Sequence, residues 1–201
     1  NFVVSTYHRM VKMVALIRDL CPDAKIILGG YGTCMENQYL EPYADFICKE
    51  DGIRFMQRLL GENDTQPIRH PYAPVPKTDI MSYRYNAVIG HLTAGLGCPN
   101  GCDFCCTSHY FRCKYKPFVK DGKELFYLFT EQYETARAKG DTVHLLMMMD
   151  EDFFTHETRA REFLEEVRKH KAHFNLGGFG SFRALEKFTA REIAEMGFDL
   201  L

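Results

Sequence analysis

Three closely spaced cysteines constrain this chain more than any other feature. Cys98, Cys102 and Cys105 form a Cys-x3-Cys-x2-Cys pattern, and five of the eight cysteines lie between residues 98 and 113. Three thiols this close together cannot all pair as disulfides, but they can converge on one inorganic cluster, because cysteine thiolates hold iron–sulfur clusters. The pattern therefore predicts a loop closed around a metal centre, with Gly97 and Gly101 allowing sharp bends.

Strands and helices are predicted to alternate on both sides of a proline-rich segment. Before it, we expect strands at 2–5, 25–28 and 44–48, and helices at 7–20, 36–40 and 51–60. After it, we expect strands at 87–93, 141–149, 172–176 and 198–201, and helices at 122–139, 155–171 and 190–196. This alternation predicts an α/β fold with parallel sheets, whose ligand sites lie at the carboxyl ends of the strands.

The same pattern divides the chain into three parts. Residues 1–61 are expected to form part of a Rossmann-like domain, residues 62–86 a linker, and residues 87–201 the first part of a (β/α) barrel. Both ends read as the interior of a strand, so we expect an internal piece of a longer protein.

The cysteine loop resembles that of the radical S-adenosylmethionine (SAM) superfamily. The resemblance rests on the cysteine spacing, on its place after a first parallel strand, and on Phe104 immediately before the third cysteine. It implies that Cys98, Cys102 and Cys105 hold a 4Fe–4S cluster with one iron left open for SAM, which the reduced cluster cleaves. It also implies a partial (β/α) barrel and an electron donor such as flavodoxin or ferredoxin.

The resemblance further implies SAM contacts at the ends of the next two strands. Asp150 and Glu151 follow the second strand, where a carboxylate suits the SAM ammonium group. The alternative is that acidic residues here favour the start of the next helix. Ser181, after a glycine-rich stretch, is expected near the SAM ribose or carboxylate, with a glycine-rich turn as the alternative.

The order of the domains resembles that of cobalamin-binding radical SAM enzymes. Leu28-Gly29-Gly30-Tyr31 and residues 43–47 match the later half of their cobalamin domain, although Lys49-Glu50-Asp51-Gly52 replaces the usual Gly-Glu-Gly-Glu. The resemblance implies bound cobalamin, with Gly29 and Gly30 close to it, and methyl transfer or radical rearrangement on a small-molecule substrate. The alternative is a Rossmann-like scaffold without cobalamin.

Two further readings remain open from the cysteines. Cys21, Cys34 and Cys48 could hold a second cluster, as in methylthiotransferases, although buried core positions explain them more simply. Alternatively, Cys106 or Cys113 could complete a zinc site or a closed cluster in a binding module that is not an enzyme.

Composition excludes several other classes of protein. Lys and Arg total 25 against 27 Asp and Glu, a net charge of −2 that disfavours a dedicated nucleic-acid or membrane-surface protein. We find no apolar run long enough to span a membrane and no signal peptide, so we expect a reducing, cytoplasmic location.

Overall fold

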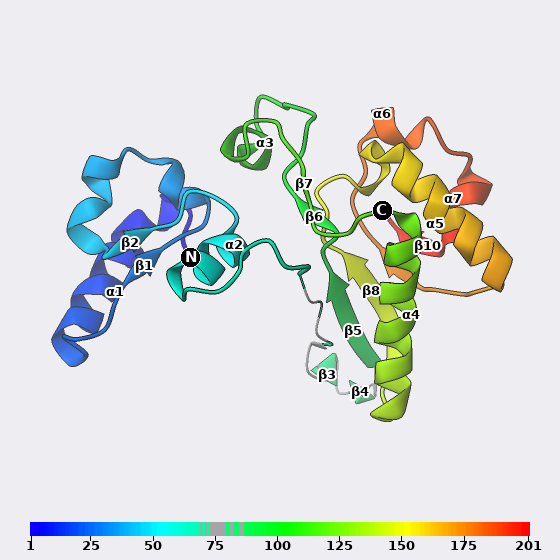
Figure 1. The fold of residues 1–201 in the computed structure, drawn as a ribbon, viewed down its shortest axis with the longest axis horizontal. Helices are drawn as coiled ribbons and strands as arrows, with labels where there is room; N and C mark the ends of the chain where they lie inside the picture. Colours follow the sequence, from blue (N-terminus) through cyan, green and yellow to red (C-terminus); the bar gives the residue numbers. More distant parts are fainter. Residues whose placement is uncertain (69, 71, 73–78, 81–82, 85–86) are drawn as a thin grey trace. The chain divides into compact units, whose positions relative to one another are not determined.

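The computed structural model describes residues 1–68, 70, 72, 79–80, 83–84 and 87–201, which form two compact units (Figure 1). Unit 1 comprises Asn1–Gln66 and Cys98–Lys114, and unit 2 comprises Pro67–Gly97 and Tyr115–Leu201. The cysteine loop thus contacts mainly the N-terminal segment, which the sequence does not predict.

Unit 1 is a small α/β unit. It contains α1 (Tyr7–Leu20), β1 (Ile27–Leu28), β2 (Phe46–Ile47), α2 (Gly52–Leu59) and α3 (Cys106–Tyr110), with single 3-10 turns at Val4–Thr6, Tyr31–Cys34, Asn37–Tyr39 and Glu41–Tyr43. The two strands pair in parallel. Its core combines α1, β1 and the turns through Phe2, Met10, Val14, Ile26, Leu28 and Leu40.

Two local predictions for unit 1 are wrong. The segment expected as a strand at 2–5 enters a 3-10 turn at Val4, and the helix expected at 36–40 is a single 3-10 turn. Phe2 nevertheless bonds like a strand residue, because its amide donates to the Gly29 carbonyl and its carbonyl accepts from the Gly32 amide.

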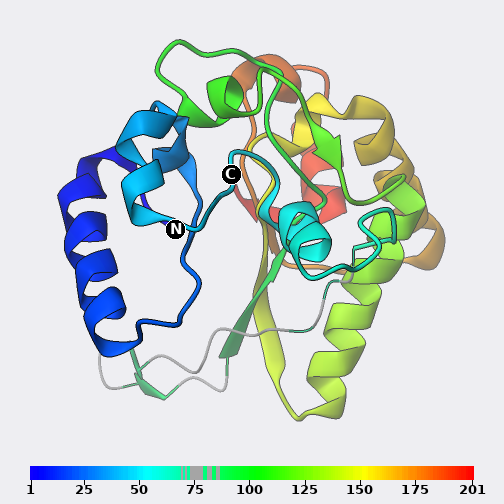
Figure 2. The same cartoon turned by 60° about the vertical axis from the view of Figure 1, so that its left-hand side comes forward.

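Unit 2 is built on a four-stranded parallel sheet in the order β10-β9-β8-β5. Its two longest strands, β5 and β8, lie side by side (Figures 1 and 2). The strands are β5 (Ala87–Leu92), β8 (Thr142–Met148), β9 (Leu176–Gly177) and β10 (Phe198–Leu200). The helices are α4 (Gly122–Ala138), α5 (Glu157–His170), α6 (Phe182–Leu185) and α7 (Ala190–Met196), with a 3-10 turn at Phe153–Thr155. The structure thus confirms the α/β class and the parallel sheet.

The core of unit 2 lies between the sheet and α4, α5 and α7. Leu146 and Met148 on β8 are almost fully buried against aromatic residues of α4 and α5, including Phe129 and Phe163. Leu145, on the other face of β8, is half-buried. The alternation follows from the strand period of two and shows that this face supplies most of the core.

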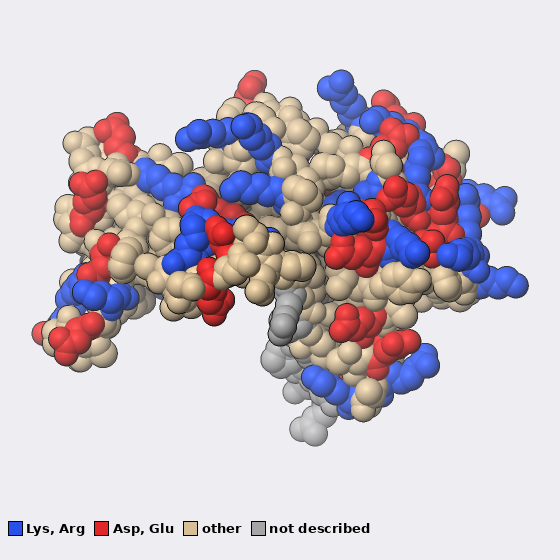
Figure 3. All heavy atoms as spheres, viewed as in Figure 1, with Lys and Arg blue, Asp and Glu red and all other residues tan. Residues whose placement is uncertain are grey.

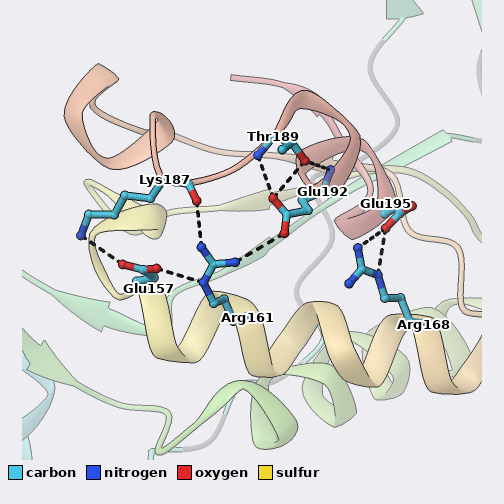
Figure 4. Close-up of polar contacts among 7 residues, drawn as sticks. All are labelled: Glu157, Arg161, Arg168, Lys187, Thr189, Glu192 and Glu195. Carbon is cyan, nitrogen blue, oxygen red and sulfur yellow. Dashed lines mark hydrogen bonds and ion pairs between the residues drawn. The ribbon is translucent and has the colours of Figure 1, made fainter.

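A network of charged side chains joins α5 to the segment before and within α7 (Figure 4). Arg161 contacts Glu157, Glu192 and the Lys187 carbonyl, while Arg168 contacts Glu195. Such exposed pairs contribute little individually. On the face drawn in Figure 3, positive and negative side chains are likewise intermixed over these helices.

The predicted linker at 62–86 lies partly outside the described residues. Its described part includes a short antiparallel pair, β3 (Asp79–Ile80) and β4 (Tyr83–Arg84). A second antiparallel pair, β6 (Gly95–Leu96) and β7 (Lys116–Pro117), was not predicted. Across the described residues, no helix combines the length and apolar character that a membrane span needs.

Candidate functional site

The cysteine loop leaves the carboxyl end of β5 and returns beside it. β6 and β7 pair antiparallel, with Gly95 opposite Pro117, and we call this pair the stem. The amides of Phe118 and Val119 both donate to the Ala94 carbonyl, at 2.8 and 3.1 Å. The stem therefore holds the two ends of the loop together within unit 2.

Within the loop, the three predicted ligands differ in exposure. Cys98 is buried, Cys105 is half-buried and Cys102 is exposed. The Cys105 amide donates to the Cys102 carbonyl at 2.9 Å. Gly101 adopts a φ of 65°, which bends the chain between Cys98 and Cys102. Phe104 is 93% exposed.

The backbone of the loop is bent as in a metal-binding loop, but the three cysteine sulfurs do not converge on one point. No group of three His, Cys, Asp or Glu side chains among the described residues is close enough to hold a metal ion. All eight cysteines lie in the described part of the chain, and none forms a disulfide. Ligation would therefore require Cys98, Cys102 and Cys105 to rotate toward one another.

The chemistry of the donor set fits an iron–sulfur cluster. Hydrogen bonding from the Ser108 amide lowers the pKa of the Cys105 thiol. A lowered pKa favours the thiolate, which is the form that ligates metals. Three thiolates in a glycine-bent loop suit an iron–sulfur cluster better than they suit a cation that prefers carboxylate ligands.

Helix α3, directly after Cys105, is held to the N-terminal part of unit 1 by hydroxyl groups. Thr107 donates to Tyr31 at 2.9 Å, and the rings of Tyr31 and Tyr110 meet edge-on at 5.4 Å. The Tyr110 hydroxyl lies 3.2 Å from both the Thr33 hydroxyl and the Cys48 carbonyl. Sequence reasoning missed these residues, because no local pattern pairs positions about eighty residues apart.

Asp150, predicted to contact SAM, lies in an internal network instead. Its carboxylate is fully buried and accepts from the Ala94 amide at 2.7 Å, from Tyr115 at 2.8 Å and from Arg159 at 2.8 Å. Arg159 also donates to the Tyr115 hydroxyl, and burial raises the pKa of that hydroxyl. The three bonds give this carboxylate a structural role at the end of β8.

Ser181 likewise bonds within the protein. Its hydroxyl donates to Asp152 at 2.7 Å and accepts from the Ala184 amide as the cap of α6. Asp152 also accepts from the Thr155 amide. These contacts join the ends of β8 and β9, while Glu151, between them in sequence, is half-buried at the same end of the sheet.

The glycines predicted to approach cobalamin approach the chain's own N-terminal residues. A Cβ on Gly30 would lie 2.9 Å from the Phe2 carbonyl oxygen, and one on Gly32 would overlap the Phe2 ring. Gly29 lies beside Asn1 and Cys48. The structure therefore explains this turn by close packing inside unit 1, as a tight turn does.

The upstream cysteines are not alike. Cys48 is buried, and burial raises the pKa of its thiol, so the core interpretation is confirmed for this residue. Cys21 and Cys34 are exposed, so the core interpretation is wrong for both.

Comparison with known proteins adds no family to this description. No protein-family model matches the chain, and searches of curated proteins and of solved structures find no significant match. The functional argument therefore rests on the cysteine loop and its setting.

Proposed function

We propose that this chain is part of a radical SAM enzyme whose Cys98, Cys102 and Cys105 hold a 4Fe–4S cluster. The observation that carries the proposal is the Cys-x3-Cys-x2-Cys loop at the carboxyl end of β5, an edge strand of a parallel α/β sheet. Ligand sites of such sheets lie at that end. The sheet order and the helices between its strands are compatible with the first part of a (β/α) barrel.

Each part of the loop has a defined task in this proposal. The three thiolates hold three irons, the bends at Gly97 and Gly101 let the sulfurs converge, and Phe104 lies exposed beside the third ligand. When bound, the cluster supplies one electron that cleaves the sulfonium of SAM into methionine and a 5′-deoxyadenosyl radical. Asp150 is bonded internally, and the SAM ammonium contact of Asp150 and Glu151 stays an expectation of the resemblance.

Cobalamin is not required by this proposal. Gly30 packs closely against the Phe2 backbone in this structure, and we derive no step through cobalamin. Cobalamin-dependent methyl transfer or rearrangement on a small-molecule substrate stays a prediction of the domain order. Absorbance of the purified protein near the cobalamin bands tests it.

The proposed function is tested by anaerobic reconstitution with iron and sulfide, followed by reduction and electron paramagnetic resonance (EPR) with and without SAM. We expect about four irons per chain and a reduced-cluster spectrum that shifts when SAM is added. The triple variant Cys98→Ala/Cys102→Ala/Cys105→Ala should lose both. The matched control Cys21→Ala/Cys34→Ala/Cys106→Ala removes three other exposed thiols and should keep both.

Other outcomes distinguish the remaining readings. About eight irons per chain, half of them lost in the control triple variant, would favour a second cluster of the methylthiotransferase kind. Zinc alone, or a cluster whose spectrum ignores SAM, would contradict the radical SAM proposal and favour a metal-stabilised binding module.

A further inference from the structure

One buried carboxylate contacts the chain on both sides of the stem. Asp150 accepts from the Ala94 amide, immediately before β6, and from the Tyr115 hydroxyl, immediately before β7. Asp150 itself follows β8, an interior strand of the sheet. Both ends of the cysteine loop are thereby tied to one point at the carboxyl end of the sheet.

Arg159 completes this arrangement from α5. Its side chain is 7% exposed and that of Asp150 is fully buried, and the guanidinium donates to both Asp150 and Tyr115. The planar guanidinium presents its donors in a fixed fork, so it sets the distance and angle between its two partners. Asp150, Tyr115 and Arg159 are therefore all in direct contact with one another.

Packing restricts Tyr115 further. A Cβ on Gly95 would lie 2.3 Å from the Tyr115 ring, so only glycine lets the ring lie against the stem. The ring also lies 3.8 Å, centroid to centroid, from that of His156. Tyr115 is thus fixed by its ring as well as by its hydroxyl.

We propose that Asp150, Tyr115 and Arg159 are positioning residues that fix the two ends of the cysteine loop side by side and so prepare the loop for cluster binding. A loop whose ends are already fixed loses less conformational freedom when its ligands converge. The inference rests on the proposed function for what the loop binds, but the positioning belongs to the metal-free chain.

The first measurement is hydrogen exchange across residues 94–119 of the metal-free chain. Tyr115→Phe keeps the ring and removes the hydroxyl, so we expect these amides to exchange about tenfold faster than in the wild type. The matched control is Tyr133→Phe, which removes a tyrosine hydroxyl bonded to the Asn175 backbone elsewhere in unit 2. The control should leave exchange in 94–119 unchanged.

The second measurement is reconstitution of the same variants. Tyr115→Phe should bind less iron per chain than Tyr133→Phe and should give a broader EPR spectrum, because a loosened loop holds the cluster in several arrangements. A loss of fold stability alone would affect both variants and would leave the spectrum of the bound cluster unchanged.

The outcomes separate this inference from the proposed function. If Tyr115→Phe exchanges in 94–119 as the wild type does, the positioning role is wrong, whatever the loop binds. If the wild type binds no cluster but Tyr115→Phe loosens the loop, the proposed function fails and the positioning role stands. If Tyr115→Phe does not fold, Gly95→Ala takes its place, because the added methyl group spreads the same stem. Hydrogen exchange across residues 94–119 and reconstitution of this variant then give the same two tests.

Discussion

Asp150 and Arg159 place opposite charges in the interior of unit 2, where their side chains are 0% and 7% exposed. Removing two charges from water is costly, and their attraction offsets that cost only when the geometry is good and the remaining polar groups are bonded. Here Ala94 and Tyr115 supply the further bonds. The largest effect on stability is therefore expected when one member of the pair is removed and the other charge stays buried.

Arg159→Leu should lower the free energy of unfolding by about 3–5 kcal/mol, because it leaves the Asp150 carboxylate buried without a counter-charge. The double variant Asp150→Asn/Arg159→Leu should be less destabilised, since the amide oxygen of Asn still accepts from Ala94 and no charge remains buried. Urea unfolding of the wild type and both variants measures this. A double variant less stable than Arg159→Leu would contradict it.

His156 should make unit 2 less stable in acid. Burial, and then the charge of Arg159, lower the pKa of its imidazole below 6.5, against opposing effects of Asp150 and Asp152. The unfolded chain therefore takes up a proton near pH 6.5 that the folded chain still refuses. Stability attributable to this residue is complete above that pH and is lost as the pH falls, by at most about 1.4 kcal/mol per pH unit.

The measurement is urea unfolding of the wild type and of His156→Gln at about pH 7.5 and about pH 5.5. The wild type should lose more stability between the two than the variant does. His70, whose pKa is also lowered by burial, remains in both proteins and cancels in the comparison. Equal losses of stability in the wild type and the variant would show that His156 titrates alike in the folded and unfolded chains.

At this scale the sequence predicts candidate residues but not their contacts. The spacing alone predicts Cys98, Cys102 and Cys105 as metal ligands, because metal-ligand patterns are local. The partners of Asp150 are not, because Tyr115 and Arg159 reach it through the fold. A carboxylate after a strand has the same sequence signal whether it faces a ligand or an internal arginine.

At the scale of elements, the sequence predicts long helices with clear start and stop signals best. The bounds predicted for α1 and α7 are confirmed, and α2 begins after an Asp51 cap that accepts from the Ile53 and Arg54 amides. The stem and the 3-10 turns escaped prediction, because pairs of two or three residues carry no periodicity. Their formation depends on tertiary bonds such as those of Ala94.

Two helices begin with the same Asp-Gly pair but in different surroundings. A Cβ on Gly122, at the start of α4, would lie 2.2 Å from the Arg159 carbonyl oxygen and 2.3 Å from the Phe163 nitrogen. Nothing lies within 4 Å of a Cβ on Gly52, at the start of α2. Gly122 thus permits the close crossing of α4 and α5.

Gly122→Ala should therefore destabilise unit 2 by about 1–3 kcal/mol or more, because backbone atoms of α5 cannot move aside cheaply. Gly52→Ala should be neutral or stabilise by up to about 1 kcal/mol, since alanine favours the helix and meets no neighbour. Thermal unfolding of both variants compares them. Similar losses for the two would show that α4 and α5 do not cross this closely.

At the scale of the whole molecule, the cysteine loop belongs to two parts of the chain. Its stem lies in unit 2, while Cys98–Lys114 groups with Asn1–Gln66 in unit 1. Composition and proline content indicate a boundary near 62–86, but they contain no signal that a later loop packs on the earlier domain. Unit 1 is therefore assembled from two segments, and α3 is where they join.

That junction predicts energetic coupling between Thr33 and Tyr110. Thr33 is fully buried, its hydroxyl lies 2.9 Å from the Cys48 carbonyl, and Tyr110 lies 3.2 Å from the same carbonyl and from Thr33. Because they share one acceptor and contact each other, removing one hydroxyl weakens what the other contributes. The effects of Thr33→Val and Tyr110→Phe should differ from additivity by about 0.5–1.5 kcal/mol.

Native-state hydrogen exchange of the α1 amides measures this coupling, because these amides report on unit 1 without requiring unit 2 to unfold. Each single variant should lower their opening free energy by about 1 kcal/mol, and the double variant by less than the sum. Tyr7→Phe, which removes a hydroxyl bonded to the Tyr39 carbonyl, is the control partner for Tyr110→Phe and should be additive with it. If Thr33 and Tyr110 were also additive, the loop would not be joined to the N-terminal segment through this carbonyl, and the cysteines would be held by the stem alone.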